Sequence, residues 1–256
     1  DGSYLNLSGN QIGAIMAKYI LEAHKNAGTL PENAALCKSI VSTDLVTKIA
    51  ESYGATMFNV LTGFKFIAEK IQEFEEKHNH TYMMGFEESF GYLIKPFVRD
   101  KDAIQAVLVV AELAAYYRSR GLTLADGIEE IYKEYGYFAE KTISVTLSGV
   151  DGAEQIKAIM AKFRNNAPKE WNTTAITVVE DFKAQTATAA DGTVTNLTTP
   201  PSDVLKYTLA DGSWIAVRPS GTEPKIKFYI AVVGESNEDS QAKIANIEAE
   251  INAFVK

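Results

Sequence analysis

The chain lacks the sequence features of several protein classes. Its 256 residues include one cysteine, Cys37, so neither an intrachain disulfide nor a cluster of thiolate metal ligands can form. No apolar run approaches the ~20 residues of a membrane-spanning helix, and the first residues are polar. The net charge of −8 disfavours a broad surface for nucleic acid or anionic membranes. We therefore expect a cytoplasmic protein without membrane or nucleic-acid partners, in which any anion-binding site is small and local.

The first 140 residues alternate between short apolar runs and segments with the three- and four-residue apolar spacing of amphipathic helices. This alternation is typical of strands that run parallel in one sheet with helices on its faces. Thr43 and Thr62 are expected N-caps, and Thr123 with Asp126 marks another helix start. The expected strands are residues 34–42, 55–61 and 81–86, and the expected helices are residues 11–25, 43–54, 62–77, 103–120 and 123–136.

The remaining residues place strands next to strands without helices between them, and Asp211-Gly212 is a strong hairpin signal. Residues 183–203 are polar and rich in threonine, which is typical of an exposed excursion. We therefore predict an α/β domain over residues 1–140, with a parallel, helix-covered sheet, followed by a smaller α+β domain over residues 141–256, with a largely antiparallel sheet. In the second domain the expected strands are residues 141–147, 175–182, 204–218 and 225–235, and the expected helices are residues 151–165 and 240–255.

The turn RPSGTEPK, residues 218–225, places two cations, two hydroxyls and a glycine between two expected strands. Such a turn can aim backbone N–H groups and hydroxyls at an anion, and glycine lets a ligand approach closely. An arginine matches phosphate oxygens with a planar fork, and a lysine adds a point charge. A solvated hairpin explains the composition equally well. The residues that would form a phosphate site are Arg218, Ser220, Gly221, Thr222 and Lys225.

The loop GFEESFG, residues 85–91, directly follows an expected parallel strand, where open α/β sheets present their ligand-binding loops. Glu87 and Ser89 can accept hydrogen bonds from the vicinal hydroxyls of a sugar. An acidic solvated loop is an equally good interpretation. Glu87 and Glu88 are adjacent in an extended stretch and should point in opposite directions, so we expect no catalytic carboxylate pair.

Two further strand-to-helix junctions carry polar residues, Thr62 with Gly63 and Lys101 with Asp102. Helix capping explains each pair without any function. Their shared location is more informative, because the junctions of one parallel sheet open onto the same rim.

Other candidate ligands favour structural roles. His78 and His80 lack a nearby third metal ligand and are expected to be solvated loop residues. Cys37 lies in an apolar strand and is expected to be a small buried hydrophobic residue. No dinucleotide-binding, nucleophile-elbow or acidic metal-loop motif occurs in the sequence.

The motifs TGFKFI, GFEESFGYLI, RDKDA and RPSGTEPKIK, in this order and spacing, resemble the C-terminal half of the α-D-phosphohexomutases, and within that family the bacterial α-phosphoglucomutases. The resemblance covers essentially the whole chain. Members of the family have four domains, which carry in order a phosphoserine, a metal loop, a sugar-binding loop and a phosphate-binding site. This chain resembles the third and fourth of them.

The resemblance implies a role for each candidate residue. Glu87 and Ser89 would contact sugar hydroxyls, and Lys101 would reach other polar groups of the substrate. Thr62 and Gly63 would line the cleft. The phosphate that does not react would be held by Arg218, Ser220, Gly221, Thr222 and Lys225.

The implied reaction interconverts glucose 1-phosphate and glucose 6-phosphate through a phosphoserine enzyme and glucose 1,6-bisphosphate, with Mg²⁺ at the metal loop. The sequence has neither the family's Ser-His-Asn-Pro serine nor its Asp-x-Asp-x-Asp loop. We therefore expect no catalytic residue and no metal ligand in this chain, no turnover by the chain alone, and a missing N-terminal half as its partner. The alternatives are a mutase of mannose, pentose or aminosugar phosphates, and a non-catalytic protein that binds a sugar phosphate.

Overall fold

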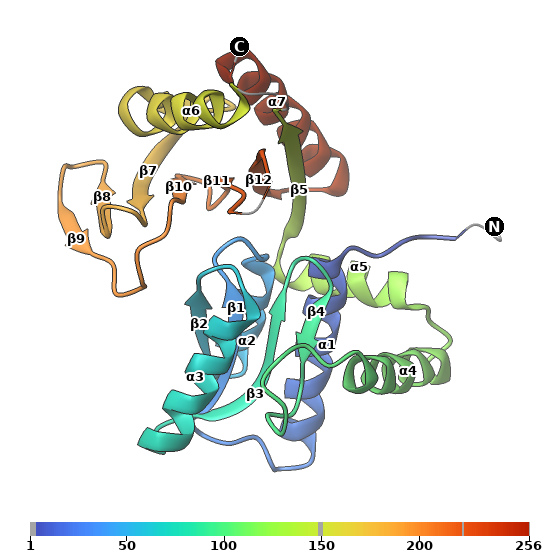
Figure 1. The fold of residues 1–256 in the computed structure, drawn as a ribbon. Helices are drawn as coiled ribbons and strands as arrows, with labels where there is room; N and C mark the ends of the chain where they lie inside the picture. Colours follow the sequence, from blue (N-terminus) through green and yellow to red (C-terminus); the bar gives the residue numbers. More distant parts are fainter. Residues whose placement is uncertain (1–3, 148–150, 222, 256) are drawn as a thin grey trace. The chain divides into compact units, whose positions relative to one another are not determined.

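The computed structural model describes residues 4–147, 151–221 and 223–255. The chain divides into two compact units, Asp1–Gly136 and Tyr137–Lys256. Each unit contains its own sheet (Figure 1). Each also has its own cluster of buried hydrophobic side chains. None of the helices in the described part of the chain has the length and apolar character that crossing a bilayer requires.

The first unit is built on a four-stranded sheet with the order β2-β1-β3-β4. β1 pairs in parallel with β2 and with β3, which confirms the predicted parallel sheet, whereas β4 pairs antiparallel with β3. β4 is absent from the expected strands because three residues inside a loop carry too little periodicity to be recognised. The strands are β1 (Ala34–Ser39), β2 (Thr56–Val60), β3 (Thr81–Glu87) and β4 (Gly91–Leu93).

Helices cover this sheet, and every residue of β1 is buried, as a strand enclosed on both faces requires. α3 packs the apolar stripe that contains Ile67 and Ile71 against Ala35 and Cys37. α1 lies against α2 and β3. The helices are α1 (Gly9–Asn26), α2 (Leu45–Ser52), α3 (Phe64–Lys77), α4 (Ala103–Ser119) and α5 (Leu124–Tyr135).

The starts of two helices differ from the expected caps. α2 has Asp44 at its N-cap rather than Thr43, although the Thr43 hydroxyl accepts a hydrogen bond from the Leu45 N–H at 3.2 Å. α3 begins after Gly63, and the Thr62 hydroxyl is buried without a hydrogen-bond partner among the described residues. The expected capping box at the start of α5 is confirmed. Each of these threonines therefore predicted a helix start within two residues, but of the three only Thr123 is the N-cap residue.

The second unit contains an eight-stranded sheet with the order β5-β12-β11-β10-β7-β8-β9, and β6 pairs with β7. All its pairings are antiparallel, which confirms the predicted sheet type. Residues 183–203 are not a plain excursion, because they contribute β8 and β9. The strands are β5 (Tyr137–Thr146), β6 (Glu170–Trp171), β7 (Thr174–Asp181), β8 (Thr186–Ala189), β9 (Val194–Asn196), β10 (Leu205–Leu209), β11 (Trp214–Pro219) and β12 (Lys225–Gly234).

Two helices, α6 (Gly152–Asn166) and α7 (Asn237–Val255), lie together on one face of this sheet (Figure 1). Their apolar residues join Val217, Ile226 and Phe228 in one cluster. Because side chains alternate along a strand, Arg218 and Lys227 point to the face opposite these helices. The predicted hairpin at Asp211-Gly212 is confirmed, with Gly212 at a φ of +85° that favours glycine.

Candidate functional site

The carboxyl ends of β1, β2 and β3 meet at one edge of the first sheet, because these strands are parallel. The loop that follows β3 begins there with Glu87 and Glu88. The junction after β2 brings Thr62 and Gly63 to the same edge. The sequence-predicted residues of the first unit therefore converge at the rim.

Glu87 is anchored at this rim. Its side chain is buried, and its Oε1 accepts a hydrogen bond from the Gly63 N–H at 2.7 Å. Gly63 is the N-cap of α3 and has a φ of +124°, a conformation that favours glycine. A carboxylate at a helix N-terminus is favoured by the helix dipole. The contact joins two loops that are 24 residues apart in the sequence and holds the carboxylate in one orientation.

Lys101 lies beside the same carboxylate. A Cβ added at Gly91 would be 2.6 Å from the Cδ of Lys101 and 3.6 Å from the Oε2 of Glu87, so this glycine makes room for both. The Lys101 ammonium lies 5.0 Å from the centre of the Phe64 ring and 2.9 Å from the Oδ1 of Asp100. A carboxylate and a cation thus flank the loop that carries the exposed Ser89.

The Glu88 side chain accepts hydrogen bonds at a different junction of the rim from that of Glu87. Its Oε2 accepts hydrogen bonds from the hydroxyls of Ser39 at 3.0 Å and Ser42 at 3.4 Å, at the junction that follows β1. Glu87 bonds instead to the junction that follows β2. The two carboxylates therefore do not form an acid–base pair, and Glu88 ties the loop to the rest of the rim.

The turn between β11 and β12 closes tightly on itself. The Ser220 N–H donates to the Lys225 carbonyl at 2.7 Å, and the Glu223 N–H donates to the Ser220 hydroxyl at 3.3 Å. A Cβ at Gly221 would meet no atom within 4 Å, so the backbone there is open to a ligand. Thr222 lies outside the described residues.

The cations of this turn differ in their surroundings. The Lys225 ammonium contacts both carboxylate oxygens of Glu223 at 3.1 Å, which neutralises part of its charge. Arg218 is paired in register with Lys227, so the two side chains lie side by side on one face of the sheet. Neither makes an ion pair or hydrogen bond with another described residue.

Lys227 is therefore a candidate phosphate ligand that the sequence analysis missed. The alternation in KIKFY puts Lys225 and Lys227 on the same side of a strand, and this signal was available from the sequence. The partner strand and its register were not.

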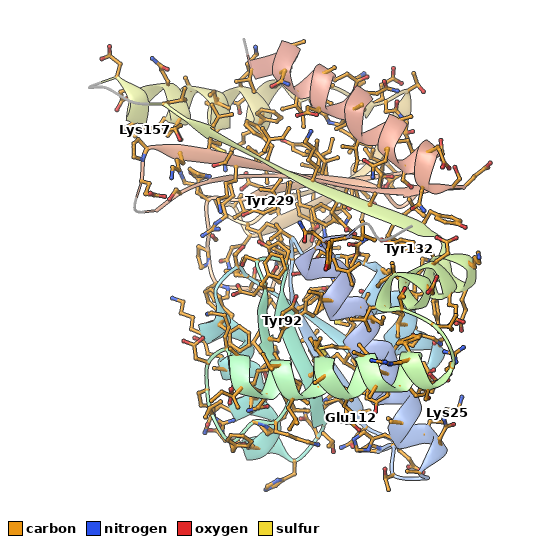
Figure 2. The ribbon with its side chains drawn as sticks, turned by 90° about the vertical axis from the view of Figure 1, so that its right-hand side faces the viewer. Lys25, Tyr92, Glu112, Tyr132, Lys157 and Tyr229 are labelled. Atoms are coloured by element: carbon orange, nitrogen blue, oxygen red, sulfur yellow. The ribbon has the colours of Figure 1, made fainter. Side chains whose placement is uncertain are left out.

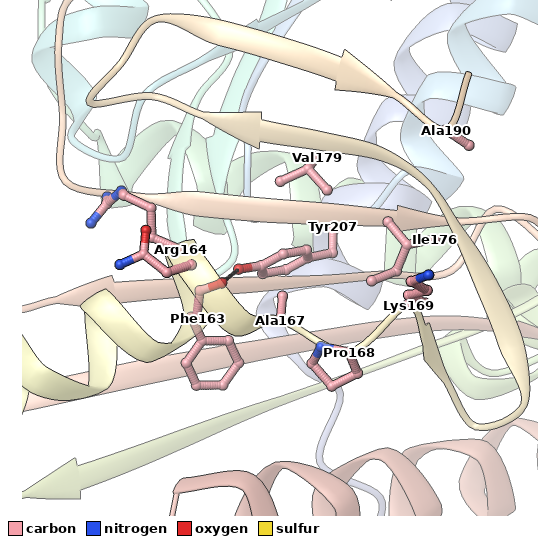
Figure 3. Close-up of a pocket in the computed structure, with 10 residues that line it drawn as sticks. Phe163, Arg164, Ala167, Pro168, Lys169, Ile176, Val179, Ala190 and Tyr207 are labelled. Carbon is pink, nitrogen blue, oxygen red and sulfur yellow. Dashed lines mark hydrogen bonds between the residues drawn. The ribbon is translucent and has the colours of Figure 1, made fainter. Parts of the chain in front are cut away.

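Two hollows in the second unit do not suit a phosphate. One, of about 370 Å³, lies between the 219–224 turn and α6 and includes the carboxylates of Asp203 and Glu223 in its wall. The other, of about 470 Å³, is lined by Arg164 and Lys169 among other residues (Figure 3). The Arg164 guanidinium bonds to Asp181 at 2.7 Å and to Asp203 at 2.8 Å. Arg218 and Lys227, for which no described carboxylate is a partner, lie on the opposite face of the sheet.

The described residues include no cluster of three or more histidine, cysteine, aspartate or glutamate side chains that could hold a metal ion. The expectation of two solvated histidines is wrong for His80, whose ring packs 4.9 Å from the ring of Phe58 and 5.1 Å from that of Phe74. Burial raises the pKa of the Cys37 thiol to about 12, so this side chain is a neutral core residue.

Comparison with known protein families identifies both units. The sequence model described as "Phosphoglucomutase/phosphomannomutase, alpha/beta/alpha domain III" matches residues 8–135, and the model of the C-terminal domain of the same family matches residues 151–253. The chain belongs to the phosphoglucomutase/phosphomannomutase family. The family that the four sequence motifs resemble is thereby confirmed.

Individual relatives agree with this membership. The chain is 37% identical over 244 residues to a phosphoglucomutase of Staphylococcus aureus, which covers 95% of this chain and 43% of the relative. A phosphoglucomutase of Staphylococcus epidermidis is 38% identical over 233 residues, covering 91% of this chain and 41% of that protein. The chain therefore spans less than half the length of the curated relatives that it matches.

Solved structures support the fold. The chain is similar to the open form of parafusin, a phosphoglucomutase from Paramecium, with a TM-score of 0.63, 19% identity, and coverage of 97% of this chain and 42% of that one. A phosphoglucomutase/phosphomannomutase family protein from Burkholderia thailandensis has a TM-score of 0.52 at 12% identity, covering 96% and 42% of the two chains.

Proposed function

We propose that this chain supplies the substrate recognition of a mutase that interconverts glucose 1-phosphate and glucose 6-phosphate in the cytoplasm. The observation that carries the proposal is the pairing of Arg218 with Lys227 beside the open turn at Gly221. Like charges directly opposite each other destabilise a sheet, whereas a dianionic phosphate placed between them makes charge-assisted hydrogen bonds with both. Membership of the phosphoglucomutase/phosphomannomutase family supports a sugar phosphate as the ligand.

The rim of the first unit is proposed to recognise the hydroxyls of the sugar. Glu87 is held by the Gly63 N–H with its Oε2 toward Gly91, and Lys101 extends along the same loop. A carboxylate oxygen accepts hydrogen bonds from hydroxyls, and an ammonium donates to their oxygens. Ser89 adds a hydroxyl at the exposed part of the loop. Thr62, whose hydroxyl lacks a described partner, borders the same rim.

The chemical step is proposed to need groups that this chain does not supply. The described residues hold no ligand set for Mg²⁺, and the sequence has no serine in the setting of the family's phosphoserine. The phosphoserine, the Mg²⁺ site and the formation of glucose 1,6-bisphosphate would therefore belong to the remaining part of a mutase, which would be the partner of this chain. The contribution of the chain is positioning, and well-oriented binding lowers a barrier by roughly 7 to 11 kcal/mol in favourable cases. By itself the chain would bind the substrate without converting it.

Isothermal titration of the chain with glucose 6-phosphate tests the proposal. We expect measurable binding that Arg218→Ala weakens at least about tenfold, because a charge-assisted hydrogen bond contributes roughly 1.5–3 kcal/mol. Lys157→Ala is the matched control, since this cation borders the hollow on the α6 side. Equal binding by wild type and Arg218→Ala, or a loss only with Lys157→Ala, would reject this assignment of the phosphate site.

The same titration with mannose 6-phosphate, ribose 5-phosphate, glucosamine 6-phosphate and inorganic phosphate addresses the sugar. Glucose 6-phosphate is expected to bind most tightly, and inorganic phosphate to bind with the same dependence on Arg218 but no dependence on Ser89. Tighter binding of another sugar phosphate would indicate that this sugar phosphate, rather than glucose 6-phosphate, is the substrate.

A further inference from the structure

The loop between β3 and β4 has an unusual residue at its last position. Glu87 pairs with Gly91, so residues 88–90 form a three-residue hairpin loop. The last residue of such a loop commonly takes a left-handed conformation, which glycine adopts most easily. Here that residue is Phe90, with a φ of +63°. A bulky side chain rarely adopts a positive φ, because its Cβ then crowds the backbone, so this conformation lowers the stability of the fold.

Burial of the Phe90 ring does not offset this cost. The residue is 61% exposed, although a phenylalanine side chain stabilises a fold mainly by being removed from water. A position that is strained and also exposes a large apolar side chain is typical of a functional site, where the ligand rather than the fold gains from the arrangement.

The backbone of the loop is held firmly by its neighbours. A Cβ at Gly9 of α1 would lie 2.0 Å from the Glu88 carbonyl oxygen and 2.9 Å from the Phe90 nitrogen, so the helix and the loop touch only because residue 9 is glycine. Tyr92 lies in the interior of the first unit, where Figure 2 labels it, and its hydroxyl donates to the Gly9 carbonyl at 2.8 Å. The Glu87 and Glu88 carboxylates accept hydrogen bonds from two further junctions. The loop therefore presents the Phe90 ring from a fixed backbone.

The groups around Phe90 match the polar part of a sugar. Ser89 is exposed beside it, and the Oε2 of Glu87 and the Cδ of Lys101 both lie close to Gly91, the next residue. A hexopyranose carries hydroxyls around its edge and C–H groups on its faces. Carboxylate, ammonium and hydroxyl groups can bond to the hydroxyls, whereas the weakly positive C–H groups pack against the negative face of an aromatic ring.

We propose that Phe90 determines specificity in the sugar site by packing its ring against the C–H face of a hexopyranose. This inference rests on the proposed function, because it needs a sugar phosphate bound at the rim. It adds a selection that Glu87 and Ser89 do not provide. Those two residues read hydroxyls, which an open-chain polyol phosphate also has, whereas the Phe90 ring selects the closed sugar ring.

Titration calorimetry of the chain with three ligands tests the proposal. Glucose 6-phosphate has the closed ring, glucitol 6-phosphate has the phosphate and hydroxyls without a ring, and inorganic phosphate has neither. Phe90→Gly and Phe90→Asn remove the aromatic ring and tolerate a positive φ, whereas Phe90→Tyr keeps the ring. His78→Gly is the control for the backbone, because His78 is exposed and has a φ of +51°. Phe97→Ala removes another exposed aromatic ring of the first unit.

We expect Phe90→Gly and Phe90→Asn to weaken glucose 6-phosphate binding by about three- to tenfold, the usual worth of an aromatic contact. Their affinities for glucitol 6-phosphate and inorganic phosphate should stay within about twofold of wild type, as should all affinities of Phe90→Tyr and of both controls. Both variants should unfold at the wild-type urea concentration or a higher one, because the strain is relieved. A residue with a purely structural role would not combine weaker binding with equal or greater stability.

Several outcomes would overturn the proposal. Wild-type affinity for glucose 6-phosphate in Phe90→Gly and Phe90→Asn is one of them. An equal loss for all three ligands would show that the loop has changed shape, and an equal loss in Phe90→Tyr or Phe97→Ala would show that the ring at position 90 is not the contact. If Phe90→Gly unfolds too readily to be titrated, Phe90→Asn decides; lower urea midpoints in both would contradict the strain from which the inference starts.

The dependence on Arg218 separates this inference from the proposed function. Binding of glucose 6-phosphate that depends on Arg218 but not on Phe90 would remove the inference and leave the proposed function intact. Binding that depends on the Phe90 ring but not on Arg218 would support the sugar contact and reject the assigned phosphate site. A wild-type chain that does not bind glucose 6-phosphate would reject both.

Discussion

Arg218 of β11 lies directly opposite Lys227 of β12, and the antiparallel register places both side chains on the face of the sheet that the helices leave uncovered. Residues opposite each other in such a pair have Cβ atoms roughly 5 Å apart. The turn that joins the two strands contains Ser220 and Gly221. Two adjacent cations near the exposed backbone of Gly221 lower the stability of the free protein and favour the binding of an anion.

Replacing Lys227 by alanine is expected to weaken glucose 6-phosphate binding by roughly tenfold or more, whereas Lys225→Ala weakens it less. The reason is that the Lys225 ammonium is already paired with the Glu223 carboxylate, whereas Lys227 lies beside Arg218 on the neighbouring strand. Removing the like charge should leave the free energy of unfolding unchanged or raise it by up to about 1 kcal/mol. Titration calorimetry and urea denaturation measure the two effects. A larger loss of affinity with Lys225→Ala than with Lys227→Ala would show that Lys225 is the main phosphate ligand of the two.

Glu87 and Ser89 are expected to differ in their effects on stability. Glu87→Ala removes the acceptor of the Gly63 N–H and should lower the free energy of unfolding by about 1–3 kcal/mol. Ser89→Ala changes an exposed side chain and should alter it by less than about 0.5 kcal/mol, yet weaken the binding of glucose 6-phosphate. Urea denaturation of both variants, together with calorimetry of Ser89→Ala, provides the comparison. Unchanged affinity in Ser89→Ala would remove this hydroxyl from the proposed sugar site.

Gly91 and Gly221 provide a matched pair of glycine-to-alanine changes. At Gly91 a Cβ would lie 2.6 Å from the Cδ of Lys101, a flexible side chain that can move aside, so affinity should fall with little loss of stability. At Gly221 the added methyl group meets no protein atom, and any loss of affinity must come from contact with the ligand. We expect both variants to unfold at nearly the wild-type urea concentration and to bind glucose 6-phosphate more weakly. Wild-type affinity in Gly221→Ala would place the phosphate away from that backbone.

Asp181 should contribute to the pH dependence of stability. Burial alone raises the pKa of this carboxyl, but hydrogen bonds from Arg164 and from the Ala184 and Lys183 N–H groups outweigh it and hold the pKa below the ordinary 3.8. A depressed carboxyl pKa stabilises the fold above the unfolded value, and this stabilisation is lost as the pH falls through the folded value. The free energies of unfolding of wild type and Asp181→Asn should therefore converge as the pH falls from about 5 through the unfolded value of about 3.9 and then through the lower folded value. Curves that stay parallel over this range would contradict the assignment.

Elements whose pattern lies within one segment of the chain were predictable from the sequence. The alternation of strands and helices up to α5 was predictable because it depends on apolar periodicity within single segments. The hairpin at Asp211-Gly212 was predictable for a similar reason, since its turn chemistry involves adjacent residues. β4, β6, β8 and β9 were missed, because strands of two to four residues take their conformation from neighbours in the sheet rather than from their own pattern.

The sequence by itself determined which side chains gather in the two candidate loops, since Glu87, Glu88 and Ser89 follow one another in the chain and Arg218 to Lys225 form one turn. Only the tertiary structure decided their partners. The Gly63 N–H orients Glu87 across 24 positions, Ser39 holds Glu88 across 49, and the strand register places Lys227 beside Arg218. Periodicity and turn chemistry act between near neighbours, whereas register and rim contacts arise from packing between segments that are distant in the sequence.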